Sequence, residues 1–402
     1  MGYLYILSQR YIIVLLSKIM KILLATPIYP PEIGGPATYI KELCERLHTK
    51  HEITVTAYTH KQEPFVGTKL IVVEKNQALI KRLLKYTIEL LKVVRGFDIV
   101  YVQNAMAAGL PTAIACSIFH VPFILKFVGD EAWERAAQRR LTEKRLEEFL
   151  KNPDGGIKIK TMMWIQGFVL RRASIVTTPS AYLGEEIIKA YKVPREKVVV
   201  NYNASENSEI LPFNVEKVEN QIVTTARLVV WKGIDGIIKA VAILKEKIPN
   251  IKLIVAGEGP ELENLQNLAR ELGVIDNVVF KGNVSRAETW QLRKKSSVYV
   301  LNSTYEGLPH VVLTSFAAMI PVVATNISGT NEAIYHEKTG LLVEPGDEKG
   351  LAEAILRLLT DKTLQEKLVH NGVDLLKTKF SWEAHIENLE KILESVVTKP
   401  LH

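Results

Sequence analysis

The sequence predicts an α/β protein built from two doubly wound, Rossmann-like domains whose parallel sheets face each other across a cleft. The chain has 402 residues, more than the ~250–300 at which a single core stops growing. Hydrophobic residues make up 47% of it, as in globular proteins, which excludes disorder as a description of the whole chain. Short apolar runs alternate with amphipathic stretches of helical length, and this alternation predicts parallel strands joined by helical crossovers.

Two series of apolar runs predict the strands. The first series is KILLAT (21–26), EITVTA (52–57), KLIVV (69–73), FDIVYV (97–102), PFILKF (122–127), SIVTT (174–178) and KVVVN (197–201). The second series is QIVTTA (221–226), KLIVAG (252–257), NVVFKG (277–282), SVYVLN (297–302), PVVAT (321–325) and GLLVE (340–344). Continuous apolar runs are typical of parallel strands that are covered on both faces. The polar stretch 203–220 between the two series predicts the linker between domains.

Two segments combine apolar and charged residues. Residues 1–19 are apolar but interrupted by Gln9 and Arg10, too short for a spanning helix and without a small-residue cleavage site. We therefore expect either that Met20 is the true start or that 1–19 is an appended amphipathic segment. Residues 79–95 (LIKRLLKYTIELLKVVR) predict a helix that lies on a membrane surface or one that packs on the core with a solvated basic face. We favour the second interpretation slightly. No later segment has the length and apolarity of a membrane span.

The net charge indicates which class of partner the protein binds, and the cysteine content indicates in which cellular compartment it works. The net charge of +7 suits an anionic partner such as nucleotide phosphates or an acidic lipid surface. Nucleic acid is not expected, because the basic residues are scattered and no aromatic platform interleaves them. The two cysteines, Cys44 and Cys116, fit neither a disulfide framework nor a metal cluster. Two buried thiols are expected in a reducing compartment, so we expect a cytoplasmic protein.

One charged segment, 133–160, interrupts the alternation of strands and helices. It predicts a helix, a turn at 152–156 and a second helix from about 158 to 172. A long excursion at the edge of a cleft is a lid or an acceptor platform in many enzymes. A simple surface insertion explains the pattern equally well.

Several loops at the ends of predicted strands carry residues suited to binding phosphates. Gly34 and Gly35 precede a helix that starts near Pro36, so backbone N–H groups can approach an anion, although a tight turn explains the pair as well. Arg227 and Lys232 flank a short loop, where two cations can neutralise a diphosphate or lie as solvated surface charges.

The remaining loops offer glycines and carboxylates. Gly257 and Gly282 end two strands, where they allow a close backbone approach or form helix entry turns. Glu306 opens the segment Glu306-Gly307-Leu308-Pro309, with Pro309 in the first turn of a helix. Its carboxylate can accept hydrogen bonds from sugar hydroxyls or complement the helix dipole. Gly329 and Glu332 follow the next strand.

Taken together, these loops resemble the retaining glycosyltransferases of family 4, which have the GT-B fold. The motifs in order are PPEIGG (30–35), TPS (178–180), YNA (202–204), ARLVVWKG (226–233), AGEGP (256–260), EGLPHVVL (306–313), PVVAT (321–325) and TGLLVEPGD (339–347). The resemblance runs from about residue 20 to 382. It implies an acceptor-binding domain at 20–205, a nucleotide-sugar-binding domain at 206–381 and a C-terminal helix at 382–402 that crosses back to the first domain.

The resemblance also implies roles for matching residues. Gly35, with Gly34, would bring backbone near the donor phosphate, and Arg227 and Lys232 would bind the donor diphosphate. Glu306 matches the first glutamate of the family's E-x7-E motif, which contacts the donor sugar. The rest of the implied donor site is Gly257, Gly282, Gly307, Leu308, Pro309 and Thr314.

The sequence departs from the family pattern at informative positions. Thr314 stands where the second glutamate of the motif normally holds the ribose hydroxyls, which puts donor affinity or nucleotide preference in doubt. Met319 stands where the family usually has glycine. The family often has a histidine after the strand matched by 122–127, but this chain reads KFVGDEAWE. Asp130 is then the nearest polar candidate to support the reaction, or else it is the N-cap of the next helix.

The implied reaction moves a hexose from a UDP- or GDP-linked donor to a glycan or lipid-linked acceptor with retention of configuration. The departing phosphate can take the acceptor's proton, so no protein base and no metal is required. We expect no bound cofactor, and a position in the cytoplasm or at the inner face of the cell membrane, with contact to anionic lipid. The alternatives are an inactive nucleotide-sugar-binding partner subunit, indicated by Thr314 and the missing histidine, and an epimerase or hydrolase, which lacks a visible pair of carboxylates.

Overall fold

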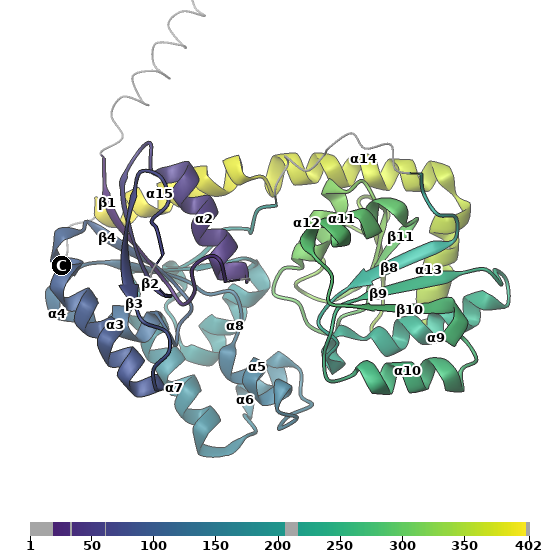
Figure 1. Ribbon diagram of the computed structural model, residues 1–402, viewed down its shortest axis with the longest axis horizontal. Helices are drawn as coiled ribbons and strands as arrows, with labels where there is room; N and C mark the ends of the chain where they lie inside the picture. The colour runs from purple at the N-terminus through teal and green to yellow at the C-terminus, as the bar shows by residue number, and fades with distance from the viewer. Residues whose placement is uncertain (1–18, 33, 61, 206–215, 399–402) are drawn as a thin grey trace, which may run out of the picture.

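The computed structural model describes residues 19–32, 34–60, 62–205 and 216–398. Two lobes lie side by side, each built around one parallel sheet with helices on both faces (Figure 1). The predicted fold class, two Rossmann-like domains of the GT-B type, is confirmed. The expectation about residues 1–19 concerns a segment of which only Ile19 is described, and residues 206–215 of the predicted linker also lie outside the described part of the chain.

The first sheet has the strand order β3-β2-β1-β4-β5-β6-β7. Its strands are β1 (Lys21–Thr26), β2 (Glu52–Tyr58), β3 (Thr68–Val73), β4 (Ile99–Gln103), β5 (Phe123–Lys126), β6 (Ile175–Thr178) and β7 (Val198–Val200). All neighbouring pairs are parallel, and β1 places Leu24 opposite Val55 of β2 on one side and Tyr101 of β4 on the other. Its helices are α2 (Gly35–Leu47), α3 (Leu79–Val93), α4 (Gly109–Phe119), α5 (Glu131–Gln138), α6 (Leu146–Lys151), α7 (Gly156–Arg172) and α8 (Ala181–Tyr191), with short 3-10 turns at η1 (Val94–Gly96) and η2 (Arg195–Lys197).

The second sheet has the order β10-β9-β8-β11-β12-β13, again all parallel. Its strands are β8 (Gln221–Thr225), β9 (Lys252–Ala256), β10 (Val278–Gly282), β11 (Val298–Leu301), β12 (Val322–Thr325) and β13 (Leu341–Val343). Its helical elements are η3 (Val230–Lys232), α9 (Ile234–Lys245), α10 (Leu262–Glu271), η4 (Ile275–Asn277), α11 (Arg286–Lys295), α12 (His310–Ala317), α13 (Glu348–Thr360) and α14 (Lys362–Lys379).

Each sheet has an apolar core on both faces, which explains why the strands are continuous apolar runs rather than alternating patterns. In β1, Leu23 and Ala25 belong to the core on one face of the sheet, and Ile22 and Leu24 belong to the core on the other. The two cysteines are buried in these cores, and burial raises the pKa of each thiol to about 12. Both thiols are therefore protonated and unreactive at neutral pH.

The C-terminal helix α15 (Trp382–Val397) leaves the second lobe and packs on the first (Figure 1). Its apolar residues, Leu389 among them, join the core under β1 and α2. His385 fixes the helix there by two hydrogen bonds, because its Nε2 lies 2.6 Å from the Tyr39 hydroxyl and its Nδ1 lies 2.6 Å from the carbonyl of Tyr202. The chain thus crosses between the domains twice, at the linker and at this helix.

The structure corrects two local predictions. The segment 133–160 contains two helices, α5 and α6, rather than one, and α7 begins at Gly156 rather than near 158. Arg140 has a left-handed backbone with φ of 55°, which ends α5 early. Pro309 is the N-cap of α12 and not part of its first turn.

Helix α3 packs less deeply than the favoured interpretation of 79–95 assumed. Only Tyr86 and Leu90 are buried, and several large apolar side chains of the helix face solvent. Among the described residues, no helix combines the length and the apolarity needed to cross a bilayer.

Candidate functional site

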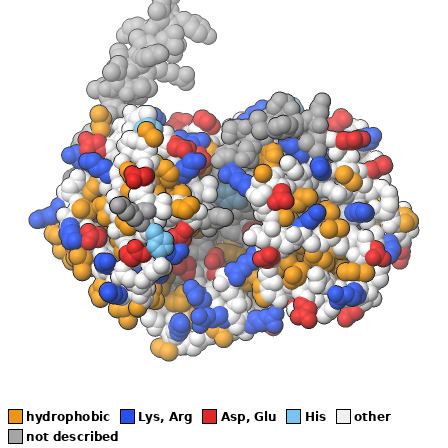
Figure 2. Space-filling view, viewed as in Figure 1, with side chains coloured by type: hydrophobic (Ala, Val, Ile, Leu, Met, Phe, Trp, Pro, Cys, Tyr) orange, Lys and Arg blue, Asp and Glu red, His pale blue; other side chains and the backbone are white. Residues whose placement is uncertain are grey.

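A cavity of about 650 Å³ lies between the two domains, at the carboxyl ends of strands from both sheets. Ligands bind at this edge in open α/β sheets, because the loops that leave the strands and the helix N-termini converge there. Figure 2 shows a hollow between the two lobes with basic and acidic side chains on its rim. Among the residues predicted for the site, those lining the cavity are Gly35, Arg227, Lys232, Glu306, Gly307, Leu308 and Thr314.

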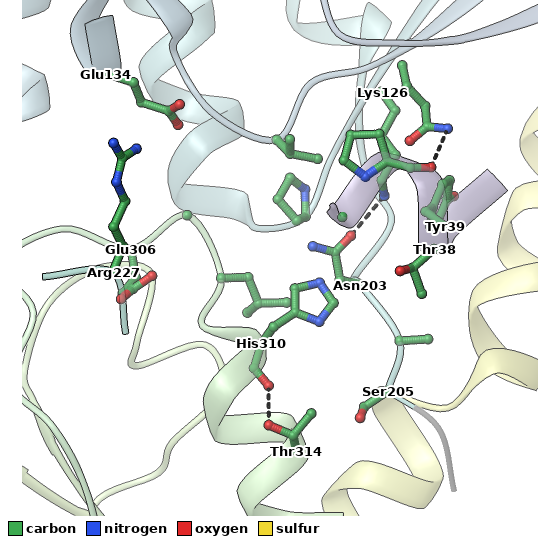
Figure 3. A pocket seen from close by; sticks show the side chains of 18 of the residues that line it. Thr38, Tyr39, Lys126, Glu134, Asn203, Ser205, Arg227, Glu306, His310 and Thr314 are labelled. Atoms are coloured by element: carbon green, nitrogen blue, oxygen red, sulfur yellow. Dashed lines mark hydrogen bonds between the residues drawn. The ribbon is translucent and has the colours of Figure 1, made fainter. Parts of the chain in front are cut away.

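The centre of the cavity is an ion pair held by the second domain. Lys232 ends η3, and its Nζ lies 2.6 Å from Oε1 of Glu306 in the loop after β11. The Ser303 hydroxyl donates a second hydrogen bond to the same carboxylate oxygen, at 2.7 Å. Arg227 follows β8 and extends its guanidinium into the same space (Figure 3). The carboxylate is 74 or more residues away from either cation in sequence, yet all three side chains line the same cavity.

The loop that carries Arg227 is shaped by a glycine in the neighbouring loop. Gly257 has φ of 139°, and a Cβ on it would lie 1.8 Å from the carbonyl oxygen of Ala226. Only glycine permits this approach of the two backbones. Gly257 therefore positions Ala226, the residue next to Arg227. Neither Gly257 nor Gly282 lines the cavity itself. The carbonyl of Gly282 accepts a hydrogen bond from Gly257 N at 2.8 Å.

The first domain contributes a helix N-terminus and a buried cation. Gly34 is the N-cap of α2, and Gly35 lines the cavity with no atom near the position of a Cβ. Lys126, the last residue of β5, lies beside it, donates a hydrogen bond to Asn203 Oδ1 at 2.8 Å and lies 4.3 Å from the ring centre of Tyr39. Burial lowers the pKa of Lys126 to about 7, so an anion bound beside it would restore its charge.

Asp130 does not lie in the cavity, which corrects its expected role near the donor carbon. Its carboxylate is buried as the N-cap of α5, where it accepts from Trp133 N at 2.8 Å and from Gln166 Nε2 at 3.2 Å. The Tyr191 hydroxyl makes a third hydrogen bond to it. All three hydrogen-bond donors belong to the first domain. The structure therefore agrees with the alternative in which Asp130 is an N-cap, and its carboxylate positions α5 rather than a substrate.

Thr314 lines the cavity one turn into α12, yet its hydroxyl is engaged by its own helix. Oγ1 donates to the carbonyl of His310 or of Val311, both at 3.1 Å. A hydroxyl used in this way offers a ligand only its lone pairs. The site thus lacks a carboxylate at this position, as the sequence indicated.

Among the cavity residues that the sequence reasoning missed are the two ionisable side chains Lys126 and Glu134. Lys126 is a cation at the carboxyl end of an otherwise apolar strand, and that position alone could have identified it. Glu134 belongs to α5 and reaches toward Arg227 from the opposite wall (Figure 3). Burial, helped by the nearby negative charges of Glu131 and Asp130, raises its pKa to about 7. The alternation of charged and apolar residues in GDEAWE gave no sign of which carboxylate would face the cavity.

No cluster of three or more His, Cys, Asp or Glu side chains suited to holding a metal ion occurs in the described part of the chain. Cations such as Arg227 and Lys232 can hold a polyphosphate, and a carboxylate such as that of Glu306 can accept hydrogen bonds from hydroxyl groups.

Comparisons with known proteins decide the family. Residues 33–206 match the family model "Glycosyltransferase Family 4", and residues 206–374 match "Glycosyl transferases group 1". The chain is a group 1/family 4 glycosyltransferase. An uncharacterized glycosyltransferase of Methanocaldococcus jannaschii, MJ1607, is 33% identical over 221 residues, which are 52% of this chain and 56% of that one.

A second relative and the solved structures agree with the assignment. The lipopolysaccharide core biosynthesis glycosyltransferase LpsD of Rhizobium meliloti is 36% identical over 163 residues, 40% of this chain and 46% of that one. The matches thus span about half the length of these curated relatives. Anabaena Alr3699/HepE in complex with UDP has the same fold, with a TM-score of 0.73 at 19% identity over 94% of this chain and 100% of that one.

Family membership also clarifies one departure. Met319, where the group 1/family 4 glycosyltransferases usually have glycine, has a left-handed backbone with φ of 57°. Glycine adopts this conformation without strain, whereas methionine does not. Methionine therefore occupies a backbone conformation here that favours glycine.

Proposed function

We propose that this glycosyltransferase moves a hexose from a UDP- or GDP-linked donor to a glycan or lipid-linked acceptor, with retention of configuration and without a metal. The observation that carries the proposal is the meeting of Arg227, Lys232 and Glu306 in the cavity between the sheets. Two cations suit a diphosphate, and the carboxylate beside them suits the hydroxyls of the attached sugar.

The proposed chemistry uses these three side chains. The acceptor hydroxyl oxygen attacks the anomeric carbon on the face from which the diphosphate departs, so the configuration is retained. The hydroxyl proton passes to the departing phosphate oxygen. Arg227 and Lys232 stabilise the negative charge that grows on the diphosphate, and the free N–H groups at the start of α2 add to this. Glu306 holds the sugar hydroxyls, and no protein base is needed.

Relatives support a role in cell-surface glycan or glycoconjugate synthesis. LpsD acts in lipopolysaccharide core biosynthesis by its name. A GDP-mannose-dependent mannosyltransferase of Mycobacterium tuberculosis, which acts on a phosphatidylinositol monomannoside, is 30% identical over 43% of this chain. Both names describe acceptors carried by lipids, and we extend that class of acceptor to this protein.

The test is a screen of nucleotide sugars for thermal stabilisation and for release of the nucleotide with acceptor present. Lys232→Ala should reduce transfer ~10²–10³-fold, since removal of one electrostatic donor to the transition state costs about 2.7–4 kcal/mol. Lys349→Ala, which removes an exposed lysine of the same domain, is the matched control and should transfer like the wild type. Equal transfer by the Lys232 variant would disprove the assigned site.

The inactive-subunit alternative rests on Thr314 and on the missing histidine after the strand at 122–127, where this chain reads KFVGDEAWE. It predicts stabilisation by one donor with no turnover over a broad acceptor panel. Turnover with any acceptor rules it out.

We also propose that the protein works in the cytoplasm, in peripheral contact with anionic membrane through α3. Ile80, Leu84 and Ile88 are 74%, 59% and 49% exposed, and their spacing of four residues aligns them on one outer face of the helix. Exposed lysines 81, 85 and 92 accompany this apolar row. An apolar row with cationic neighbours suits the surface of an anionic bilayer.

Sedimentation with vesicles tests this contact. Binding should occur with vesicles rich in phosphatidylglycerol and weaken in high salt, and Leu84→Ser should reduce it. Leu272→Ser, at an exposed leucine of the second domain, is the control. Absence of binding to anionic vesicles would refute the contact and leave the glycosyl transfer unaffected.

A further inference from the structure

Two glutamates of the first domain line the cavity, and Glu42 forms an ion pair with Arg46 of its own helix. Glu134 is the other, and the proposed reaction does not use its carboxylate. Its carboxylate receives no hydrogen bond and no ion pair within 4 Å from any residue that the structure describes. Figure 3 shows it pointing from α5 toward the guanidinium of Arg227. A carboxylate that lacks donors and faces the diphosphate-binding cations needs an explanation.

The loop before α5 is shaped to leave room for this carboxylate. A Cβ on Gly129 would lie 2.5 Å from Oε1 of Glu134 and 4.0 Å from the hydroxyl oxygen of Tyr305. That hydroxyl is buried and has no hydrogen-bond partner among the described residues. Two polar groups from opposite domains therefore converge beside Gly129 with unused hydrogen-bonding capacity, as at a site that binds a ligand.

The charges around Glu134 come from both domains. The titratable groups that face it are Asp130, Glu131, Arg227, Lys232 and Tyr305. Its two acidic neighbours and its burial favour the neutral acid, whereas Lys232 favours the anion, and together they bring its pKa to about 7. It is thus poised to change protonation near neutral pH.

A bound diphosphate would disturb this balance. Arg227 and Lys232 carry two positive charges, and Glu134 and Glu306 carry two negative charges when both are ionised. A diphosphate adds two more negative charges between them. Lys232 and Ser303 both donate hydrogen bonds to the Glu306 carboxylate, at 2.6 and 2.7 Å. Glu134 has no such donors, so it is the group that takes up a proton.

We propose that Glu134 binds the donor in its protonated form, so that binding of a nucleotide diphosphate is coupled to the uptake of one proton from solvent. The inference rests on the proposed function, because it requires a diphosphate at Arg227 and Lys232. The neutral acid can then donate its proton in a hydrogen bond to a phosphate oxygen, where the anion could only repel it.

Titration calorimetry of a nucleoside diphosphate tests the coupling. At pH 8, the apparent binding enthalpy should vary with the ionisation enthalpy of the buffer. The slope of this dependence should correspond to the uptake of up to one proton. The dissociation constant should be constant below about pH 7 and should rise up to tenfold per pH unit above it. Glu134→Gln, which mimics the neutral acid, should bind without proton uptake and with a pH-independent affinity.

The control is Glu143→Gln, which removes an exposed carboxylate of the same domain and should keep the wild-type pH dependence. Wild-type binding without proton uptake at pH 8, or equal uptake by Glu134→Gln, would overturn the inference, and the wild-type measurement alone decides it if the variant does not fold. Absence of binding by any nucleoside diphosphate would instead overturn the proposed function on which it rests.

Discussion

The two domains are joined across the cleft by Glu332, and removing this side chain should loosen them. Its carboxylate, in the loop after β12, accepts hydrogen bonds from the backbone N–H groups of Ala181 and Tyr182, at 2.8 and 2.9 Å. These N–H groups form the N-terminus of α8 in the first domain, which carries a partial positive charge. The Tyr202 hydroxyl adds a third hydrogen bond at 3.2 Å.

The magnitude follows from the number and exposure of these bonds. Hydrogen bonds to a charged group contribute ~1.5–3 kcal/mol each, so the two backbone bonds together reach ~3–6 kcal/mol. The Ala181 bond is exposed, and water replaces the carboxylate there when the domains separate. We therefore expect Glu332→Ala to cost about half of that sum, ~1.5–3 kcal/mol. This corresponds to a roughly 10- to 150-fold shift of the equilibrium toward an open arrangement.

Hydrogen exchange and small-angle scattering measure this effect together. The Ala181 and Tyr182 amides should exchange at least ~10-fold faster in Glu332→Ala, because the carboxylate is their only acceptor among the described residues. The radius of gyration should increase at the same time. Ser180→Ala is the control, since it removes the cap on Leu183 N within the first domain, at a cost of ~1 kcal/mol, without touching the contact between domains.

The reasoning fails if Glu332→Ala keeps wild-type exchange at these two amides and an unchanged radius of gyration. An expansion in the Ser180→Ala control would also contradict it, because the opening would then follow from loss of helix stability rather than from the lost carboxylate.

Three further predictions concern single residues. Thr314→Glu should tighten the binding of the donor nucleotide by ~1 kcal/mol or more, since a carboxylate accepts from ribose hydroxyls more strongly than a hydroxyl group does; unchanged calorimetric affinity would contradict the ribose assignment. Gly257→Ala should lower the free energy of unfolding by ~1–3 kcal/mol in urea titrations, because its Cβ would clash with the Ala226 carbonyl. Burial lowers the pKa of His385 from 6.5 to about 3. The contribution of neutral His385 to the free energy of unfolding is therefore full above pH 6.5 and falls by ~1.4 kcal/mol per pH unit as the pH decreases toward 3. His385→Leu should reduce the slope of unfolding free energy against pH in this acid range, and an unchanged slope would argue against the reasoning.

The sequence determined the fold and the cationic half of the site. Apolar runs as short as LLV at β13 identify strands, because a parallel strand covered on both faces must be apolar at every position. Arg227, Lys232 and Glu306 were also identifiable, because each follows a strand and the carboxyl ends of parallel strands meet at one edge. Nothing in their local sequence, however, states that Lys232 lies 2.6 Å from Glu306, since that distance depends on loops from different strands.

Tertiary structure alone decided the roles of the carboxylates. Asp130 and Glu134 are four residues apart, and the point at which α5 begins makes the first an N-cap and directs the second into the cavity. A shift of one residue in the helix start would rotate both side chains by about 100°, and sequence patterns do not fix helix ends that closely. The bonds from Glu332 to α8 and the packing of α15 on the first domain join segments more than 150 residues apart. Such contacts form only when the two folded domains pack against each other, so a local sequence pattern does not predict them.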